Sequence, residues 1–194
     1  GIDAVSFTGS SATGERLEAL CGRLHRPISA ETGGKNAIII MDDANLTLAI
    51  EGAIWGAFGT TGQRCTAASR LIVHKKVYTK FIEIFKEAAS RLRLGNGLKP
   101  TTDMGPVINE SQYNKILNYI KIGEEEGAKL ILGGKPYKKG ECARGYFIEP
   151  TIFIDVDPKM RIAQEEIFGP VVCIIKAQDL EDAINIANGT PYGL

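Results

Sequence analysis

The chain has 194 residues, enough for one sizeable α/β domain or for one domain with a piece of another. Its 23 basic and 23 acidic residues balance, so no basic excess points to nucleic acid, and we predict no such partner. No apolar run approaches the ~20 residues that span a bilayer, so we predict no membrane partner. The first residues lack the charged and apolar regions of a signal peptide.

The four cysteines are scattered and form no C-x-x-C pair, and none has a histidine at metal-ligand spacing, so we predict no zinc site. Sparse cysteines in an α/β chain favour a reducing compartment. We therefore expect a cytoplasmic location.

The first 60 residues alternate between strand and helix patterns. In chain order they predict a strand at 4–8, a helix at 12–24, a strand at 27–31, a strand at 36–41 and a helix at 45–59. The 36–41 run is continuously apolar, which suits a parallel strand that is buried on both faces. The glycines at 33 and 34 separate the first two strands from the third and predict a hinge between two subdomains.

The alternation continues to the C-terminus. It predicts a strand at 70–74, helices at 77–92 and 109–126, strands at 129–132, 147–154 and 171–177, and a helix at 180–188. A stretch rich in Gly and Lys at 133–145 is predicted to be a surface loop. Strands that alternate with helices imply βαβ units, so we predict an α/β fold with a mostly parallel sheet flanked by helices.

Cys65 stands in a Gly-led turn, Gly-Gln-Arg-Cys-Thr, between a long apolar helix and a strand. An arbitrary cysteine is most often a small buried apolar residue. Here the neighbouring Arg64 would favour a thiolate, and the small residues that follow leave room for backbone N–H groups to face a substrate oxygen. The pattern therefore leaves two interpretations of Cys65: a catalytic nucleophile or a small structural residue.

Three further segments carry polar groups next to glycine. Glu31 precedes Gly33 and Gly34, and by itself it is either a general base or an ordinary solvated carboxylate. Glu165 and Glu166 precede a Phe-Gly-Pro turn, which is either an acidic loop or a ribose-binding carboxylate. The Phe-Thr-Gly-Ser turn at 7–10 could face a phosphate or a cofactor, but a lone glycine pattern is weak evidence.

In this order and combination, the segments resemble the aldehyde dehydrogenase superfamily. The signatures are Phe-Thr-Gly-Ser at 7–10, Glu-x-Gly-Gly-Lys at 31–35, Gly-Gln-x-Cys at 62–65 and Glu-Glu-Ile-Phe-Gly-Pro at 165–170, with a further matching segment at 145–151. The resemblance covers essentially the whole chain. It implies that 1–32 is the C-terminal piece of a dinucleotide-binding domain and that 33–194 is a truncated catalytic domain.

The resemblance also implies a reaction. Cys65 corresponds to the catalytic thiol, which would add to an aldehyde and form a hemithioacetal. Transfer of hydride to NAD or NADP would leave a thioester on Cys65. Glu31 corresponds to the base that activates water to hydrolyse this thioester. The expected product is a carboxylic acid.

The implied cofactor contacts come from three turns. Glu166 resembles the ribose-binding acid and Phe168 the aromatic residue beside the nicotinamide riboside. The resemblance assigns the other cofactor contacts to Gly9, Ser10, Thr32 and Gly33. Thr32 stands where the family most often has Leu, which leaves the two glycines intact.

Three alternatives remain open: a dehydrogenase that passes the acyl group to coenzyme A, a non-catalytic relative, and a plain α/β domain whose motifs are structural. Glu31 argues against the first, because the acylating branch generally lacks this base. The substrate is predicted to be a small-molecule aldehyde. A semialdehyde is one candidate, because Arg64 would steer its anionic group. We expect the chain to be inactive alone and its parent protein to be a homodimer or homotetramer.

Overall fold

A five-stranded sheet forms the centre of the computed structural model, which describes residues 1–194. Its strands are β3 (Ala37–Ile40), β4 (Arg70–His74), β5 (Lys129–Leu132), β6 (Thr151–Ile154) and β7 (Val171–Ala177). They lie in the order β3-β4-β7-β6-β5, and only the edge strand β5 is antiparallel to its neighbour. The predicted α/β fold with a mostly parallel sheet is confirmed.

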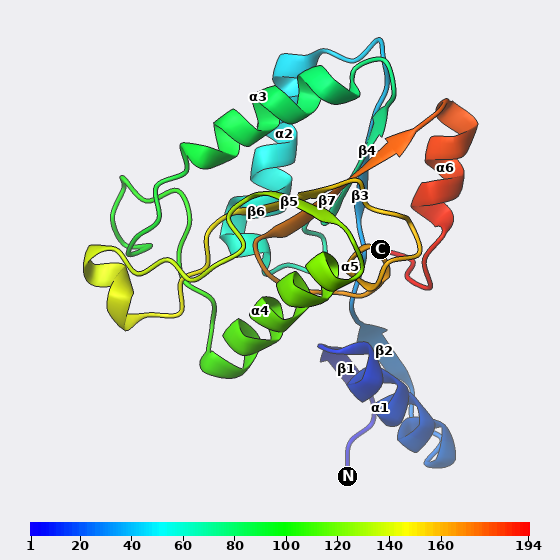
Figure 1. Ribbon diagram of the computed structural model, residues 1–194. Coiled ribbons are helices and arrows are strands. Elements are labelled where there is room, and N and C mark those ends of the chain that lie inside the picture. The colour runs from blue at the N-terminus through cyan, green and yellow to red at the C-terminus, as the bar shows by residue number, and fades with distance from the viewer.

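Helices cover both faces of this sheet (Figure 1). One face carries α2 (Leu46–Phe58) and α3 (Tyr78–Ser90). The other face carries α4 (Glu110–Glu125), α5 (Arg161–Gln164) and α6 (Leu180–Asn188). None of these helices combines the length and the apolar character that a membrane crossing requires.

Alternate residues of the central strands belong to two separate cores. On β4, Leu71 packs with α2 and α3, whereas Ile72 packs on the side of α4, α5 and α6. On β7, Ile174 and Ile175 divide in the same way. Successive side chains of a strand point to opposite faces, so a sheet that is covered on both faces requires continuously apolar strands. This requirement explains why the apolar runs were readable in the sequence.

The first 32 residues form a separate piece, here called the N-terminal unit. It contains β1 (Val5–Thr8), α1 (Ser11–Arg23) and β2 (Ile28–Glu31), and its two parallel strands pair only with each other. The N-terminal unit projects away from the five-stranded sheet (Figure 1). Its helix begins after Ser10, whose side chain accepts a hydrogen bond from the N–H of Thr13 at 3.4 Å.

The elements differ from the prediction where local chemistry interrupts the pattern. The strand predicted at 147–154 begins only at Thr151, because Pro150 has no N–H to donate to a neighbouring strand. Ile148 forms only an isolated bridge with Pro136. Helix α5 and the 3-10 turns η1 (Gly59–Gly62) and η2 (Gly140–Arg144) are too short for an amphipathic pattern, and the prediction lacked them.

Candidate active site

A cleft of about 550 Å³ opens between the N-terminal unit and the five-stranded sheet. It lies at the carboxyl ends of β1 and β2 and at the amino ends of β3, β4 and β7. Its lining residues are Thr8, Gly9, Ser10, Thr32, Gly33, Gln63, Arg64, Cys65, Thr66, Gln112, Lys115, Glu166 and Phe168. The cleft therefore brings together Cys65 and every predicted cofactor residue, whereas Glu31 is not part of its lining.

Cys65 is the only one of the four thiols that is open to this cleft. It is half-buried, whereas Cys21, Cys142 and Cys173 are buried, and all four are free. Burial raises the pKa of the Cys142 thiol, and it raises that of Cys173 to about 11. A thiolate is the reactive form of cysteine. Burial thus disfavours both Cys142 and Cys173 as nucleophiles and leaves Cys65 as the accessible thiol.

The turn that carries Cys65 begins with a run of left-handed backbone. Thr60, Thr61 and Gly62 have φ angles of 56°, 60° and 67°. A β-branched residue rarely adopts this conformation, which costs on the order of 1–3 kcal/mol per residue. A side chain at Gly62 would also place its Cβ 2.2 Å from the carbonyl oxygen of Gly169. The surrounding structure must therefore hold this run in place.

Hydrogen bonds to the 105–108 segment supply that support. The Thr61 hydroxyl donates to the carbonyl of Gly105 at 3.1 Å. The Gln63 side chain donates to the carbonyl of Pro106 at 3.2 Å and accepts from the N–H of Ile108 at 2.9 Å. Gln63 of the Gly-Gln-x-Cys signature directly follows the strained run and lies two residues before the thiol. Its hydrogen bonds anchor the run to the 105–108 segment.

Glu166 is seated on the two glycines that follow β2. Its Oε1 accepts a hydrogen bond from the Gly34 N–H at 3.2 Å. A Cβ at Gly33 would lie 2.7 Å from its Oε2, so a side chain there would displace the carboxylate. This contact explains physically why glycine is needed at position 33. The Gly34 N–H thus holds one carboxylate oxygen of Glu166, and the other oxygen lies against the backbone of Gly33 at the cleft wall.

Phe168 adopts a left-handed conformation with φ of 59°, and a side chain that the sequence analysis missed supports it. The Gln112 amide on α4 donates to the carbonyls of Ile167 and Phe168 at 2.8 and 2.9 Å. Lys115, one turn further along α4, also lines the cleft. The apolar pattern of α4 predicts which face of the helix is buried in the core. It does not indicate that Gln112 and Lys115, on another face, contact the cleft.

Beneath the cleft, Lys35 and Arg70 tie the chain segments together. Lys35 is fully buried, and its Nζ donates to the carbonyl of Glu165 at 2.6 Å. Burial lowers the pKa of Lys35 to about 8. The buried Arg70 guanidinium donates to the carbonyls of Lys35, Ile186 and Ala187, and thereby joins the start of β3 to the C-terminal end of α6.

Glu31 ends β2, and its side chain is exposed. Its carbonyl accepts a hydrogen bond from the N–H of Gly9 at 3.1 Å, which links the two predicted cofactor turns. The next residues, Thr32 and Gly33, line the cleft. Glu31 therefore adjoins the cleft in sequence and faces solvent in the structure, and its predicted role as a base stays a prediction.

The chain matches the aldehyde dehydrogenase family model over residues 1–194. It belongs to the aldehyde dehydrogenase family. It is 48% identical over 194 residues to the 2,5-dioxopentanoate dehydrogenase of Saccharolobus solfataricus, covering 99% of this chain and 40% of that protein. It is 45% identical over 196 residues to the 1-pyrroline-5-carboxylate dehydrogenase of Bacillus subtilis, covering 98% and 37%.

A solved structure shows the same fold. The betaine aldehyde dehydrogenase of Staphylococcus aureus, in complex with NAD+, superposes with a TM-score of 0.97 and 39% identity, over 100% of this chain and 38% of that chain. The resemblance read from the five sequence segments is thus confirmed. The chain spans about two fifths of the length of the curated aldehyde dehydrogenases it matches.

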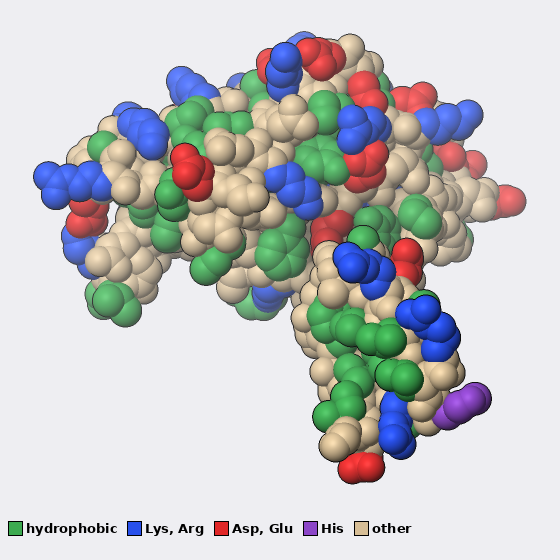
Figure 2. Space-filling model, turned by 90° about the horizontal axis from the view of Figure 1, so that it is seen from below, with side chains coloured by type: hydrophobic (Ala, Val, Ile, Leu, Met, Phe, Trp, Pro, Cys, Tyr) green, Lys and Arg blue, Asp and Glu red, His purple; other side chains and the backbone are tan.

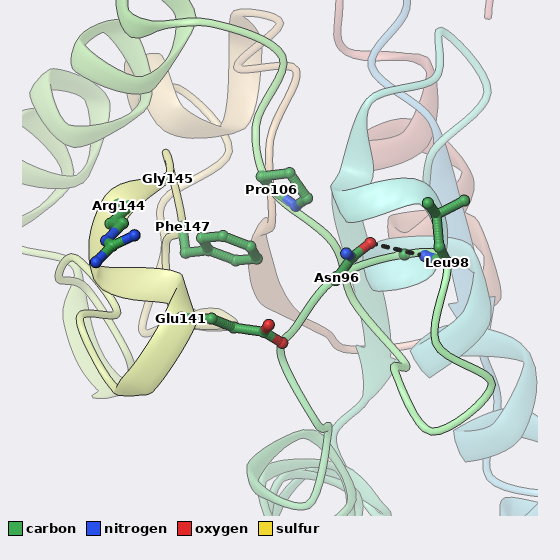
Figure 3. A pocket seen from close by; sticks show the side chains of 8 residues that line it. Asn96, Leu98, Pro106, Glu141, Arg144, Gly145 and Phe147 are labelled. Atoms are coloured by element: carbon green, nitrogen blue, oxygen red, sulfur yellow. Dashed lines mark hydrogen bonds between the residues drawn. The ribbon is translucent and has the colours of Figure 1, made fainter.

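A second cavity of this aldehyde dehydrogenase chain, about 440 Å³, lies between the 96–98 turn and the 141–147 segment (Figure 3). Two of its polar side chains are engaged within the protein: Asn96 accepts from the Leu98 N–H at 3.0 Å, and Glu141 pairs with Lys99 at 2.7 Å. Pro106 lines it while its carbonyl binds Gln63. The cavity thus lies against the 105–108 segment, which supports the turn that carries Cys65.

Proposed function

We propose that this chain supplies the catalytic thiol and part of the cofactor site of an NAD(P)-dependent aldehyde dehydrogenase, which oxidises an aldehyde to a carboxylic acid. The observation that carries the proposal is the single cleft that joins Cys65 to two glycine turns and to Glu166. The family match and the aldehyde and semialdehyde dehydrogenases among its relatives support it.

Residues 1–32 would be the C-terminal piece of the dinucleotide-binding domain, and 33–194 the catalytic domain. Within the N-terminal unit only Gly14 and Cys21 are buried. Hydrophobic side chains gather on its surface (Figure 2), and Ile2, Leu20 and Leu24 are among the exposed ones. A two-stranded sheet is not independently stable in water, so further chain would cover these apolar residues in the whole protein.

The cleft suits NAD or NADP. Gly9 and Gly33 bring backbone without side chains to its walls, and Ser10 adds a hydroxyl. The Glu166 carboxylate would accept hydrogen bonds from ribose hydroxyls, as acidic residues do in dinucleotide sites. Phe168 would lie against the nicotinamide riboside, and Thr32 would face the nicotinamide through its backbone. When bound, the nicotinamide would accept a hydride from the substrate carbon.

Cys65 would attack the aldehyde carbon as a thiolate and form a carbon–sulfur bond and an oxyanion. The Cys65 backbone N–H donates to no acceptor within the protein and would stabilise this oxyanion. A donor of this kind contributes about 3–4 kcal/mol to the barrier reduction. Loss of hydride from the same carbon would leave a thioester on the Cys65 sulfur.

Glu31 would then activate the water that hydrolyses the thioester. Its exposed carboxylate has access to water, and the residues after it form the cleft wall. A general base of this kind accelerates a reaction by about 10²–10⁴-fold. Glu31→Gln should therefore give a burst of NAD(P)H followed by slow turnover, with Glu18→Gln, an exposed glutamate on α1, as the matched control.

The substrate would be a small aldehyde, and we favour a semialdehyde that carries an anionic group. Arg64, next to the thiol, lines the cleft and has no carboxylate partner. Its guanidinium stacks on Trp55 with its centre 4.2 Å from the ring centroid. The guanidinium also donates to the Trp55 carbonyl at 3.4 Å, but no carboxylate neutralises its charge, which would attract an anion. The relatives named for 2,5-dioxopentanoate and 1-pyrroline-5-carboxylate support this class.

The decisive experiment measures NAD(P)H formation across aldehydes by a full-length protein that carries this chain. Cys65→Ala should lower turnover by at least ~10³-fold, because no other group forms the thioester. Cys142→Ala, a buried thiol outside the cleft, is the matched control and should retain activity. Turnover by the Cys65→Ala protein would refute the proposal, and a strict need for coenzyme A would identify an acylating enzyme instead.

We further propose a cytoplasmic location and a homodimeric or homotetrameric parent protein. The support for the location is that all four cysteines are free, as expected in a reducing compartment. The support for the assembly is the family resemblance alone. Fluorescence localisation and light scattering of the full-length protein test these two points.

A further inference from the structure

The segment that follows Glu31 reaches the nucleophile turn directly. The Asn36 side-chain Nδ2 donates to the carbonyl oxygen of Cys65 at 2.6 Å. The backbone carbonyl of Asn36 accepts hydrogen bonds from the N–H groups of Ser69 and Arg70 at 3.2 and 3.1 Å. Asn36 therefore binds both the thiol residue itself and the end of the turn that carries it, where β4 begins.

Asn36 itself is firmly held. The Arg70 guanidinium donates two hydrogen bonds to the carbonyl of Lys35, the preceding residue, at 2.9 and 2.7 Å. At Gly34, a Cβ would lie only 2.6 Å from the Cys65 carbonyl oxygen, so the two segments touch closely. The donor that faces Cys65 thus belongs to a rigid part of the chain.

This hydrogen bond controls one peptide plane. A trans peptide group is planar, and its C=O and N–H point in opposite directions. Asn36 holds the C=O of the Cys65–Thr66 peptide, while the Thr66 N–H donates to no acceptor within the protein. The Asn36 contact is therefore the only protein hydrogen bond that this peptide group makes.

We propose that Asn36 is a positioning residue for the reaction of Cys65. Its amide fixes the Cys65–Thr66 peptide plane and, through it, the direction from which the sulfur meets the aldehyde carbon. A small misplacement of a reacting group can cost about 10²-fold in rate. The inference rests on the proposed function, because the rate in question is that of thioester formation.

The test variant is Asn36→Asp in a full-length protein that carries this chain. Aspartate has the same shape, but its carboxylate cannot donate to the Cys65 carbonyl. In the Glu31→Gln background, in which thioester hydrolysis is slow, the rate constant of the NAD(P)H burst should fall at least tenfold, while the burst amplitude per subunit stays unchanged. The KM for the cofactor should stay within about twofold, because Asn36 does not line the cleft. A carboxyl group in this part-buried position faces the Cys65 carbonyl oxygen, which raises its pKa above the usual range. As the pH falls from about 8 to about 6, a growing fraction of the aspartic acid is therefore protonated and can donate again, so the ratio of variant to wild-type rates should rise.

Asn36→Ala is the second variant and should slow the burst without the pH-dependent recovery. Asn45→Asp is the matched control, because Asn45 caps α2 and aspartate caps a helix equally well. Wild-type burst rates in both Asn36 variants would overturn the inference, as would a fall in amplitude at an unchanged rate. Absence of any NAD(P)H formation by the wild-type protein would instead refute the proposed function. In that case, iodoacetamide alkylation of Cys65 decides the positioning role: slower alkylation in both variants supports it, and wild-type rates overturn it.

Discussion

The five-stranded sheet and the N-terminal unit share one strand–helix pattern but differ in what covers them. All five residues of β4 are buried, and the sheet has helices on both faces. In the N-terminal unit, β1 and β2 alternate between half-buried and exposed residues, and none of their residues is buried. The difference teaches that the pattern specifies the type of an element, whereas burial decides whether a region can stand alone.

The two regions also present opposite strand ends to the cleft. The N-terminal unit contributes the carboxyl ends of β1 and β2, where open α/β sheets bind ligands. The five-stranded sheet contributes amino ends, and there the reactive turn is placed by strained loops and by side-chain hydrogen bonds. The position of the proposed cofactor turns therefore follows the general topology rule, whereas the position of the thiol depends on individual contacts.

The largest expected effect on stability comes from truncating a side chain of α3 in the core between this helix and the sheet. Phe85 is fully buried and stacks on Phe58 and Phe81 with ring centroids 6.0 and 5.5 Å apart. Phe85→Ala should lower the free energy of unfolding by about 3–5 kcal/mol, because it removes buried area and leaves a cavity. Urea unfolding of this chain, followed by circular dichroism, measures the change.

Leu20 in the N-terminal unit is the matched comparison, since 43% of its surface is exposed. Leu20→Ala should change the same free energy by less than about 0.5 kcal/mol. Equal losses for the two variants would contradict the difference in burial and would mean that the N-terminal unit is packed as tightly as the sheet.

A smaller effect is expected from Lys35, the buried cation where the two regions meet. Its folded-state pKa of about 8 lies below the usual lysine pKa of 10.5. Between these two values the unfolded chain holds a proton that the folded protein has released, so folding becomes more favourable as the pH rises. Relative to Lys35→Met, the wild-type protein should gain up to about 3 kcal/mol across this window.

The measurement is the difference between wild-type and Lys35→Met unfolding free energies at several pH values from about 7 to about 11. Taking the difference removes the contribution of groups that do not interact with Lys35. The buried Cys173 does interact with it, and its raised pKa acts in the opposite direction, so Cys173→Ala is placed in both proteins. A difference that does not change with pH would show that Lys35 keeps its proton through its bond to the Glu165 carbonyl.

The sequence predicted the apolar strands of the sheet well because helices cover both faces of the sheet. The runs at 36–41 and 171–177 need no knowledge of their partners to be recognised as apolar strands. The strand predicted at 147–154 was too long, because the prediction ignored that Pro150 has no backbone N–H to donate to a neighbouring strand. Short helices such as α5 lack the several turns that reveal a helical period.

The residues of the candidate site were predictable where they belong to a fixed local sequence pattern. Cys65, Gly33 and Glu166 belong to such patterns, and the structure brings them into one cleft. Gln112 and Asn36 were missed, because common polar residues reveal their function only through the backbone groups that tertiary structure brings to them. Neither the strained run before Cys65 nor its anchors at 105–108 can be read from local propensity.

The smallest predicted effect tests whether the N-terminal unit unfolds separately from the sheet. Gly22 lies in α1, and a Cβ there would meet no atom within 4 Å. Gly22→Ala should stabilise the helix by about 0.5 kcal/mol, because alanine loses less backbone freedom on folding. At Gly14 in the same helix a Cβ would lie 2.7 Å from the Thr32 methyl group, so Gly14→Ala should not stabilise it.

Hydrogen exchange measured by mass spectrometry distinguishes local from global effects of Gly22→Ala. If α1 opens independently of the sheet, its amides should exchange about twofold more slowly in the variant, whereas those of β4 and β7 should be unaffected. The separate sheets and the uncovered surface of the N-terminal unit favour this outcome. Slower exchange by the same factor in α1, β4 and β7 would mean that the cleft contacts already couple the two regions into one cooperative unit.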